Sequence, residues 1–277
     1  MILKTTFLPI ITTILVVFIS CNNEDKYRAD GMARFTKDVA FQNSHEIPKS
    51  FDYLPRGEMI IFSATDGEKA SAYVVRPSIP TTKKLMVFHE WWGLNDHIRL
   101  EAERLFDSLG VEVWALDLYD GKVATDREQA GKLMQSRKQE RLEAIIRGAI
   151  RQLGPDAEIA TTGWCFGGGW SLGASLLAGK QSKACVIYYG MPVDRADQLA
   201  PLTAPVLGLF GEKDAWINQD VVDRFDALCK ATGKSFEWEM YPADHGFANP
   251  SSPKFSENPA KQANARSLQF LRTHLLP

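Results

Sequence analysis

Short apolar runs rich in β-branched residues alternate with longer segments of helical periodicity along most of this chain. Runs of this length suit strands, and the segments between them are long enough to cross from one parallel strand to the next. We therefore expect an α/β fold in a single domain, with a mainly parallel sheet covered by helices on both faces. The expected strands cover 59–63, 72–75, 85–89, 111–116, 159–162, 185–189, 206–210 and 236–241.

Two helical segments stand out. Apolar residues spaced by three and four positions between Leu142 and Leu153 form one stripe, and a last helix is expected from about Pro259 to Leu275. Hydrophobic residues make up 45% of the 277 positions, enough for a large core and too many for a disordered chain. The balance of 32 basic and 34 acidic residues offers no basic patch, so we expect no nucleic-acid partner.

The first 20 residues read as a signal peptide, with Lys4 followed by an apolar and hydroxyl run. This run is shorter than the roughly 20 apolar residues that cross a bilayer comfortably. Phe18-Ile19-Ser20-Cys21 resembles a bacterial lipobox, although Leu is usual where Phe18 stands. The resemblance implies lipidation of Cys21 and a lipoprotein held in the bacterial cell envelope, on the periplasmic or outer-membrane face. An uncleaved anchor and ordinary secretion are the alternatives.

Residues 21–50 are polar and weakly periodic, which is typical of a tether between an anchor and a domain. We expect little fixed structure in this segment. The folded domain is then expected to span 51–277.

The segment from Gly163 to Gly169 joins a predicted strand to a predicted helix through several glycines. This pattern predicts a sharp turn that lifts Cys165 above the sheet, with Gly163 and Gly167 where a Cβ would collide with backbone. The free N–H groups of the following helix would stabilise a thiolate and later an oxyanion. We expect the N–H of Phe166 to be the first such donor.

This glycine cluster has two other interpretations. A dinucleotide site needs G-x-G-x-x-G and an acidic residue about 20 positions later, and neither is present. Alternatively, Cys165 is a buried structural cysteine and the glycines serve only helix packing. That second interpretation stays open at the level of this motif.

A nucleophile on such a turn needs a histidine base and an orienting carboxylate, in the chain order nucleophile, acid, histidine. His245 follows the strand 236–241 in a loop, and Asp214 follows the strand 206–210. Both therefore lie at the carboxyl edge of the sheet. The other histidines fit less well, because they lie in the tether, at a strand end or in helices: His45, His89, His97 and His274.

Together these motifs resemble the dienelactone hydrolase family of the α/β-hydrolase superfamily. The resemblance covers about 56–275 and is carried by 163–168, 88–93, 117–119 with 126–129, and the loops of Asp214 and His245. It implies an α/β-hydrolase fold and a carboxylic ester hydrolase. In such an enzyme Cys165 attacks a small ester or lactone and forms an acyl-enzyme, His245 is the base and Asp214 orients it.

The resemblance also implies further site residues. Glu90 would hold the resting thiol and take its proton, and the N–H of Trp91 would complete the oxyanion hole. Arg127 matches the first of two arginines that grip a substrate carboxylate, whereas Asn249 stands where the second would fall. His89-Glu90 is not a zinc motif, because H-E-x-x-H would need a second histidine at Gly93. We expect no metal and no cofactor, and a monomer.

Two other classes of function remain open, a non-catalytic binding protein on the same fold and a thiol oxidoreductase. The second would need a resolving cysteine near Cys165, yet no C-x-x-C spacing is present. Cys185 and Cys229 are expected to be apolar filler, and a disulfide between them stays open. The natural substrate is not fixed by the sequence.

Overall fold

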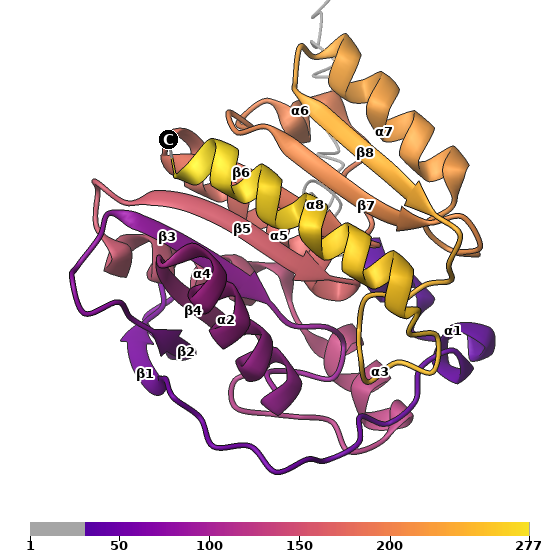
Figure 1. Ribbon diagram of the computed structural model, residues 1–277, viewed down its shortest axis with the longest axis horizontal. Coiled ribbons are helices and arrows are strands. Elements are labelled where there is room, and N and C mark those ends of the chain that lie inside the picture. Colours follow the sequence, from indigo (N-terminus) through magenta and orange to yellow (C-terminus); the bar gives the residue numbers. More distant parts are fainter. Residues whose placement is uncertain (1–30, 277) are drawn as a thin grey trace, which may run out of the picture.

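Eight strands form one sheet in the order β1-β2-β4-β3-β5-β6-β7-β8 in the computed structural model, which describes residues 31–276 (Figure 1). β1 and β2 run antiparallel to their neighbours, and the strands from β3 to β8 are parallel. The strands are β1 Glu58–Ser63, β2 Lys69–Val75, β3 Lys83–Phe88, β4 Glu112–Asp117, β5 Glu158–Trp164, β6 Ser182–Tyr188, β7 Val206–Gly211 and β8 Phe236–Tyr241. Every expected strand is present, which confirms the α/β prediction.

Helices cover both faces of the sheet. In Figure 1, α2 and α8 lie in front of the central strands and α5 lies behind them. The helices are α2 Asp96–Leu109, α3 Arg127–Ser136, α4 Gln139–Leu153, α5 Phe166–Ala178, α6 Ala196–Leu199, α7 Gln219–Ala231 and α8 Glu257–Leu275, with a 3-10 turn, η3, at Gly179–Gln181. Strands buried on both sides explain why the central runs are apolar throughout and do not alternate.

The register of the central strands sets where the functional loops begin. Phe88, the last residue of β3, pairs with Leu116 of β4 on one side and with Gly163 of β5 on the other. The carboxyl ends of β3 and β5 therefore lie level. The loop that carries Glu90 and the turn that carries Cys165 consequently leave the same edge of the sheet side by side.

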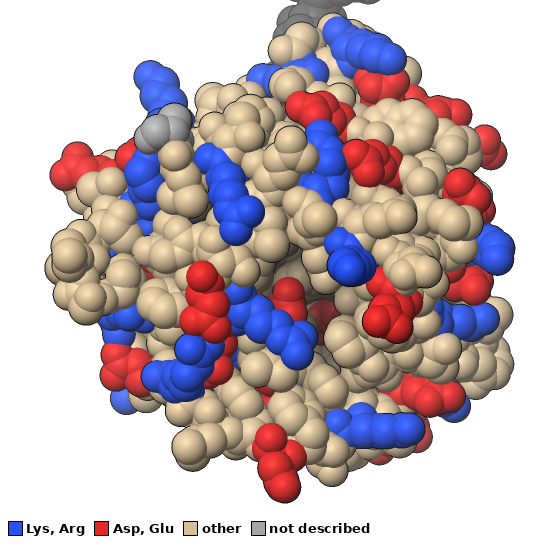
Figure 2. Space-filling view, in the orientation of Figure 1, with Lys and Arg blue, Asp and Glu red and all other residues tan. Residues whose placement is uncertain are grey.

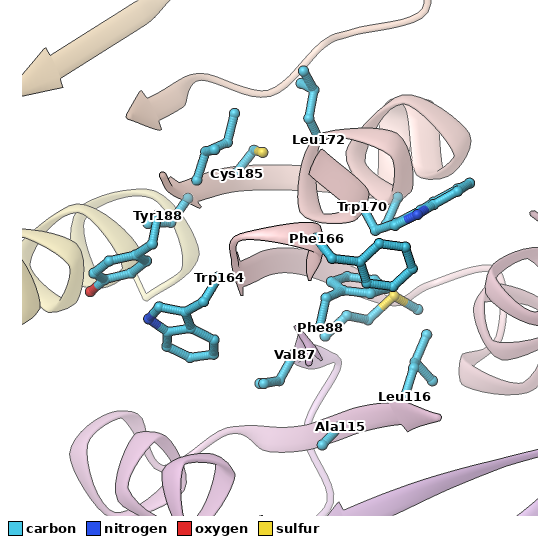
Figure 3. Packing of buried hydrophobic residues seen from close by; sticks show 14 of the residues in the cluster. Val87, Phe88, Ala115, Leu116, Trp164, Phe166, Trp170, Leu172, Cys185 and Tyr188 are labelled. Carbon is cyan, nitrogen blue, oxygen red and sulfur yellow. The ribbon is translucent and has the colours of Figure 1, made fainter. Parts of the chain in front are cut away.

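Aromatic packing fixes the start of α5 against this edge. Figure 3 shows Phe166 and Trp170 of α5 beside Phe88 of β3. All three side chains are buried, and the rings of Phe166 and Trp170 lie 6.4 Å apart. Buried aromatic side chains of this size each contribute several kcal/mol to folding, on the order of 3–5 by truncation to alanine. The turn at Cys165 is thus held by a rigid core on the α5 side.

The segment 31–46 differs from expectation and packs on the domain; we call it the N-terminal strap. It contains a 3-10 turn, η2 Gly31–Phe35, and a short helix, α1 Val39–Asn43, whose first N–H groups are capped by Asp38. Phe41 is fully buried, and the indole N–H of Trp216 donates to Asp38 over 2.9 Å. The prediction of little fixed structure is therefore wrong for these residues. Isolated apolar residues of the strap pack against residues that are distant in the sequence. Such contacts leave no periodic pattern from which a helix or strand could be predicted.

The predicted signal peptide and the predicted lipidation site Cys21 lie outside the described residues. Within 31–276, no helix has the length and apolar character needed to cross a bilayer.

Candidate active site

Cys165 occupies a strained turn between β5 and α5. Its backbone has φ 54° and ψ −115°, a left-handed conformation that is rare for a residue with a side chain. A Cβ on Gly163 would collide with the backbone of Gly167, and one on Gly167 would collide with the Phe88 carbonyl. The predicted need for glycine at both positions is confirmed. The close packing of Gly163 on Gly167, and of Gly167 on the Phe88 carbonyl, keeps the Cys165 backbone in this conformation.

The thiol of Cys165 is enclosed, with the residue only 1% exposed. Burial raises the pKa of Cys165 above its ordinary value, while the neighbouring His245 ring and the Phe166 N–H act to lower it. The net shift is upward, so burial favours the neutral thiol over the thiolate. Ionisation of this thiol would therefore need a nearby base.

Asp214 and His245 form a buried pair beside the thiol. His245 donates from Nδ1 to Oδ2 of Asp214 over 2.6 Å, and both residues are 3% exposed. The other oxygen, Oδ1, accepts the N–H groups of Trp216 and Ile217 at 2.8 and 2.9 Å. Burial alone would raise the pKa of Asp214, but His245 and these N–H groups hold it below its ordinary value. Asp214 is thus a fixed carboxylate.

This carboxylate favours a protonated imidazole. Burial acts to lower the pKa of His245, but the Asp214 carboxylate raises it well above the ordinary value. With Nδ1 committed to Asp214, the ring presents Nε2, which is buried and makes no hydrogen bond to the described residues. The ring can therefore take a proton at Nε2 and keep it as an imidazolium.

A second histidine, which the sequence reasoning placed in the tether and set aside, reaches the same site. His45, Cys165 and His245 each offer a donor atom, and these atoms lie within 4.8 Å of one another. The His45 ring packs 4.4 Å from the Trp91 ring and 5.6 Å from the His245 ring. The only sequence signal that could have found it is the cluster of aromatic residues in an otherwise polar segment.

The His45 ring is held in one orientation and stays neutral. Its Nδ1 lies 2.7 Å from the Phe41 carbonyl, so Nδ1 carries the proton and donates it. Burial lowers the pKa of His45 to about 3, and the nearby His245 ring adds to this effect. Arg127 donates from Nε to the His45 carbonyl over 2.5 Å, which fastens the end of the strap to the start of α3.

Glu90 lies at the end of β3, where it was predicted. Two hydrogen bonds of the His89 ring fix this loop, one at the Glu90 carbonyl over 2.6 Å and one from the Leu118 N–H over 3.1 Å. The Glu90 carboxyl accepts from Asn249 Nδ2 and, at 3.5 Å, from the Tyr189 hydroxyl. Burial raises the pKa of Glu90 to about 7. Its hydrogen bonds therefore run to Asn249 and Tyr189, not to the Cys165 thiol.

The two residues predicted to bind substrate make protein contacts instead. Arg127 holds the strap, and Asn249 holds Glu90. Neither contact was predicted, because each joins segments that are distant in the sequence. That Arg127 binds a substrate carboxylate stays a prediction. Its hydrogen bond to the His45 carbonyl gives it a structural role as well.

A cavity of about 220 Å³ approaches the site from the surface. Its lining includes Glu90, Asn249, Phe51, His97 and Trp164. Figure 2 shows a hollow near the middle of the face that α2 and α8 cover in Figure 1, with acidic side chains in its wall. Glu90 connects this cavity with the thiol, because it lines the cavity and its carboxyl is close enough to affect the pKa of Cys165.

The remaining cysteines lie apart from this chemistry. Cys185 in β6 and Cys229 in α7 are both buried and free, so the described residues contain no disulfide between them. Burial raises the pKa of Cys185 to about 11 and that of Cys229 to about 12. Both are inert thiols, as expected for apolar filler.

The model of the dienelactone hydrolase family matches residues 70–275. The chain belongs to this family. A protein named usf from Aquifex pyrophilus is 30% identical over 209 residues, which cover 70% of this chain and 87% of that protein. Carboxymethylenebutenolidase 1 of Cupriavidus pinatubonensis is 26% identical, with 76% and 94% covered. This dienelactone hydrolase family member is a hydrolase that acts on ester or lactone bonds, as the sequence resemblance implied.

A solved structure shows the same fold. The dienelactone hydrolase of Anabaena variabilis superimposes with a TM-score of 0.59 at 18% identity, covering 80% of this chain and all of the other. The family match begins at residue 70. The N-terminal strap, including His45, therefore lies outside the residues that the family model matches.

Proposed function

We propose that Cys165, His245 and Asp214 act as a catalytic triad that cleaves an ester or lactone through a thioester acyl-enzyme. The observation that supports this most directly is the ordered series of buried groups, from the Asp214 carboxylate through the His245 ring to the Cys165 thiol. The thiol stands on a strained turn at the start of a helix, a placement typical of nucleophiles in this fold.

The reaction follows from the protonation states of these groups. Glu90 takes the thiol proton when substrate enters, and the sulfur attacks the substrate carbonyl carbon beside the His245 imidazolium, which Asp214 stabilises. The imidazolium then protonates the leaving alkoxide, which departs and leaves a thioester on Cys165. Water, deprotonated by the same ring, attacks this thioester and releases the carboxylic acid, which restores the thiol.

The negative oxygen of each tetrahedral intermediate needs donors nearby. The Phe166 N–H starts α5 beside the sulfur, and the Trp91 N–H belongs to the loop after β3, which leaves the same edge of the sheet. We assign these two groups as the oxyanion hole. Loss of one such donor typically slows an acyl transfer by about 10²–10³-fold.

Glu90 is proposed to respond to substrate at the mouth of this site. Its pKa of about 7 means that it is partly protonated at neutral pH, and its side chain lines the cavity that we assign to substrate. A substrate that displaces Asn249 from the carboxyl would let Glu90 turn toward the thiol and accept its proton, as the family resemblance implies.

The test is hydrolysis of p-nitrophenyl acetate and a panel of short lactones by the purified protein. Cys165→Ala is expected to lower kcat/KM by at least about 10³-fold, since the thioester cannot form. Cys185→Ala, which removes a buried cysteine outside the site, should leave it within a few fold. Mass spectrometry of quenched parent enzyme should find an acetyl group on Cys165. Undiminished turnover by Cys165→Ala would refute the triad.

We also propose that the mature chain is a monomeric lipoprotein anchored in the cell envelope through Cys21. This rests on the lipobox-like sequence at 18–21. A labelled fatty acid should be incorporated into the full-length chain and not into its Cys21→Ala variant. The solution mass of the chain without residues 1–21 should be that of one copy; a dimeric mass would contradict the monomer, and label on Cys21→Ala would contradict the anchor.

A further inference from the structure

The cluster of His45, Cys165 and His245 has more donor atoms than hydrolysis by the proposed triad uses. The triad accounts for Cys165 and His245, whereas His45 is brought to the same place by the strap. Among the described residues, these three are the only histidine, cysteine or acidic groups gathered closely enough to surround one ion.

The hydrogen bonds of both histidines resemble those of metal ligands. A metal-binding histidine commonly donates one ring N–H to a carboxylate or a backbone carbonyl, which fixes the tautomer and leaves the other nitrogen for the ion. His245 donates to the Asp214 carboxylate, and His45 donates to the Phe41 carbonyl. The nitrogen that each ring has left to offer is Nε2, and that of His245 is buried without a partner in the described residues.

The spacing is close to that of a tetrahedral zinc site. Zinc bonds of about 2.3 Å to sulfur and about 2.0–2.1 Å to nitrogen place the donor atoms roughly 3.5 Å apart. The three donors here lie within 4.8 Å of one another, so a shift of about 1 Å is enough. His45 lies on a strap held to the domain largely by side chains, which makes this the element best able to move.

We propose that His45, Cys165 and His245 bind a thiophilic divalent transition-metal ion, with Zn²⁺ the best match, and that this ion inhibits hydrolysis. Two imidazole nitrogens and a thiolate suit zinc, and a fourth position remains for water. Binding breaks the S–H bond of Cys165, forms a sulfur–zinc bond and releases one proton to solvent; no electron is transferred. The ion then occupies both the nucleophile and the Nε2 atom that the base would use.

The strap supplies the third ligand of this metal site. Two ligands, Cys165 and His245, come from the family fold, while the third comes from a segment outside the family match. Removing His45 therefore converts a three-ligand site into a two-ligand site and leaves the proposed triad intact. Metal binding itself does not depend on the proposed hydrolysis; only the inhibition does.

The experiment measures metal binding directly. It uses the folded protein from residue 22 to residue 277. Co²⁺ added to the thiol form should produce a sulfur-to-cobalt charge-transfer absorption, and a zinc-binding dye should report the dissociation constant for Zn²⁺ by competition. His45→Ala should weaken zinc binding at least tenfold, and Cys165→Ala should abolish the cobalt band. The matched control is His274→Ala, which removes a histidine from the last turn of α8.

The results separate this proposal from the triad. Equal zinc affinity in the parent and His45→Ala, or an absent cobalt band, would overturn the metal site even if hydrolysis is normal. Strong binding with no effect on turnover would support the site and refute the inhibition. If His45→Ala unfolds, His45→Gln, which keeps a polar side chain of similar reach, must show the same loss of affinity for the proposal to stand.

Discussion

Replacing Arg127 by alanine distinguishes two explanations of this residue. In the structure its Nε donates to the carbonyl of His45, the residue of the strap whose side chain lies near the thiol. A hydrogen bond with one charged partner contributes about 1.5–3 kcal/mol, and we take the lower value because Arg127 is partly exposed. A loss of about 1.5 kcal/mol should raise the opening equilibrium of the strap roughly tenfold.

Hydrogen exchange of the strap amides is the appropriate assay. The N–H groups of Gln42 and Ser44 donate to the Asp38 and Ala40 carbonyls, each over 3.0 Å, so they exchange only when α1 opens. In Arg127→Ala their exchange should be roughly tenfold faster. The control is Lys132→Ala in the same helix, which removes an exposed cation and should leave the exchange of the strap unchanged.

Steady-state kinetics of Arg127→Ala test the alternative, that Arg127 binds a carboxylate on the substrate. If Arg127 acts only through the strap, Arg127→Ala should change kcat/KM for neutral and anionic esters by the same factor. If Arg127 grips a substrate carboxylate, the loss should fall on anionic esters alone. A selective loss on anionic esters together with unchanged exchange at Gln42 and Ser44 would refute the structural explanation.

Two further predictions concern stability. Gly167→Ala would press a Cβ into the Phe88 carbonyl and should destabilise the fold by about 1–3 kcal/mol in urea unfolding, whereas Gly131→Ala, whose Cβ meets no atom closer than 3.6 Å, should be neutral or stabilising. Burial opposes ionisation of Glu103, yet hydrogen bonds from two tyrosines and Arg56 lower its pKa to about 2. Its contribution to the free energy of unfolding, about 3 kcal/mol, should be complete above pH 4.5 and lost as the pH falls toward 2; an unchanged pH dependence in Glu103→Gln would contradict this.

The central fold was predictable because its signals are local. A parallel strand buried on both faces reads as a short apolar run, and a covering helix reads as a stripe at three- and four-residue spacing. The turn at Cys165 was predictable for a related reason. Only glycine fits where two backbones meet, so Gly163 and Gly167 mark the close approach in the sequence itself.

The surroundings of the thiol were less predictable because they depend on contacts between distant segments. Asp214 and His245 could be placed by chain order, since each follows a strand. The hydrogen bond from Asn249 to Glu90 and the burial of Phe41 join residues far apart in the chain, and neither leaves a periodic pattern. His45 was set aside for this reason, although it lies at the site.

Enclosure of the thiol suggests what limits access to it. Glu90 and Asn249 line the cavity, whereas Cys165 is only 1% exposed and is not among the lining residues, so a molecule in the cavity reaches the sulfur only after a neighbouring group moves. Asn249 is one such group and the strap is the other. The strap is held by the buried ring of Phe41 and by few polar contacts, among them those of Asp38 and Arg127. The strap lies outside the residues that the family model matches, so its stability can be changed by substitutions that leave the matched residues unaltered.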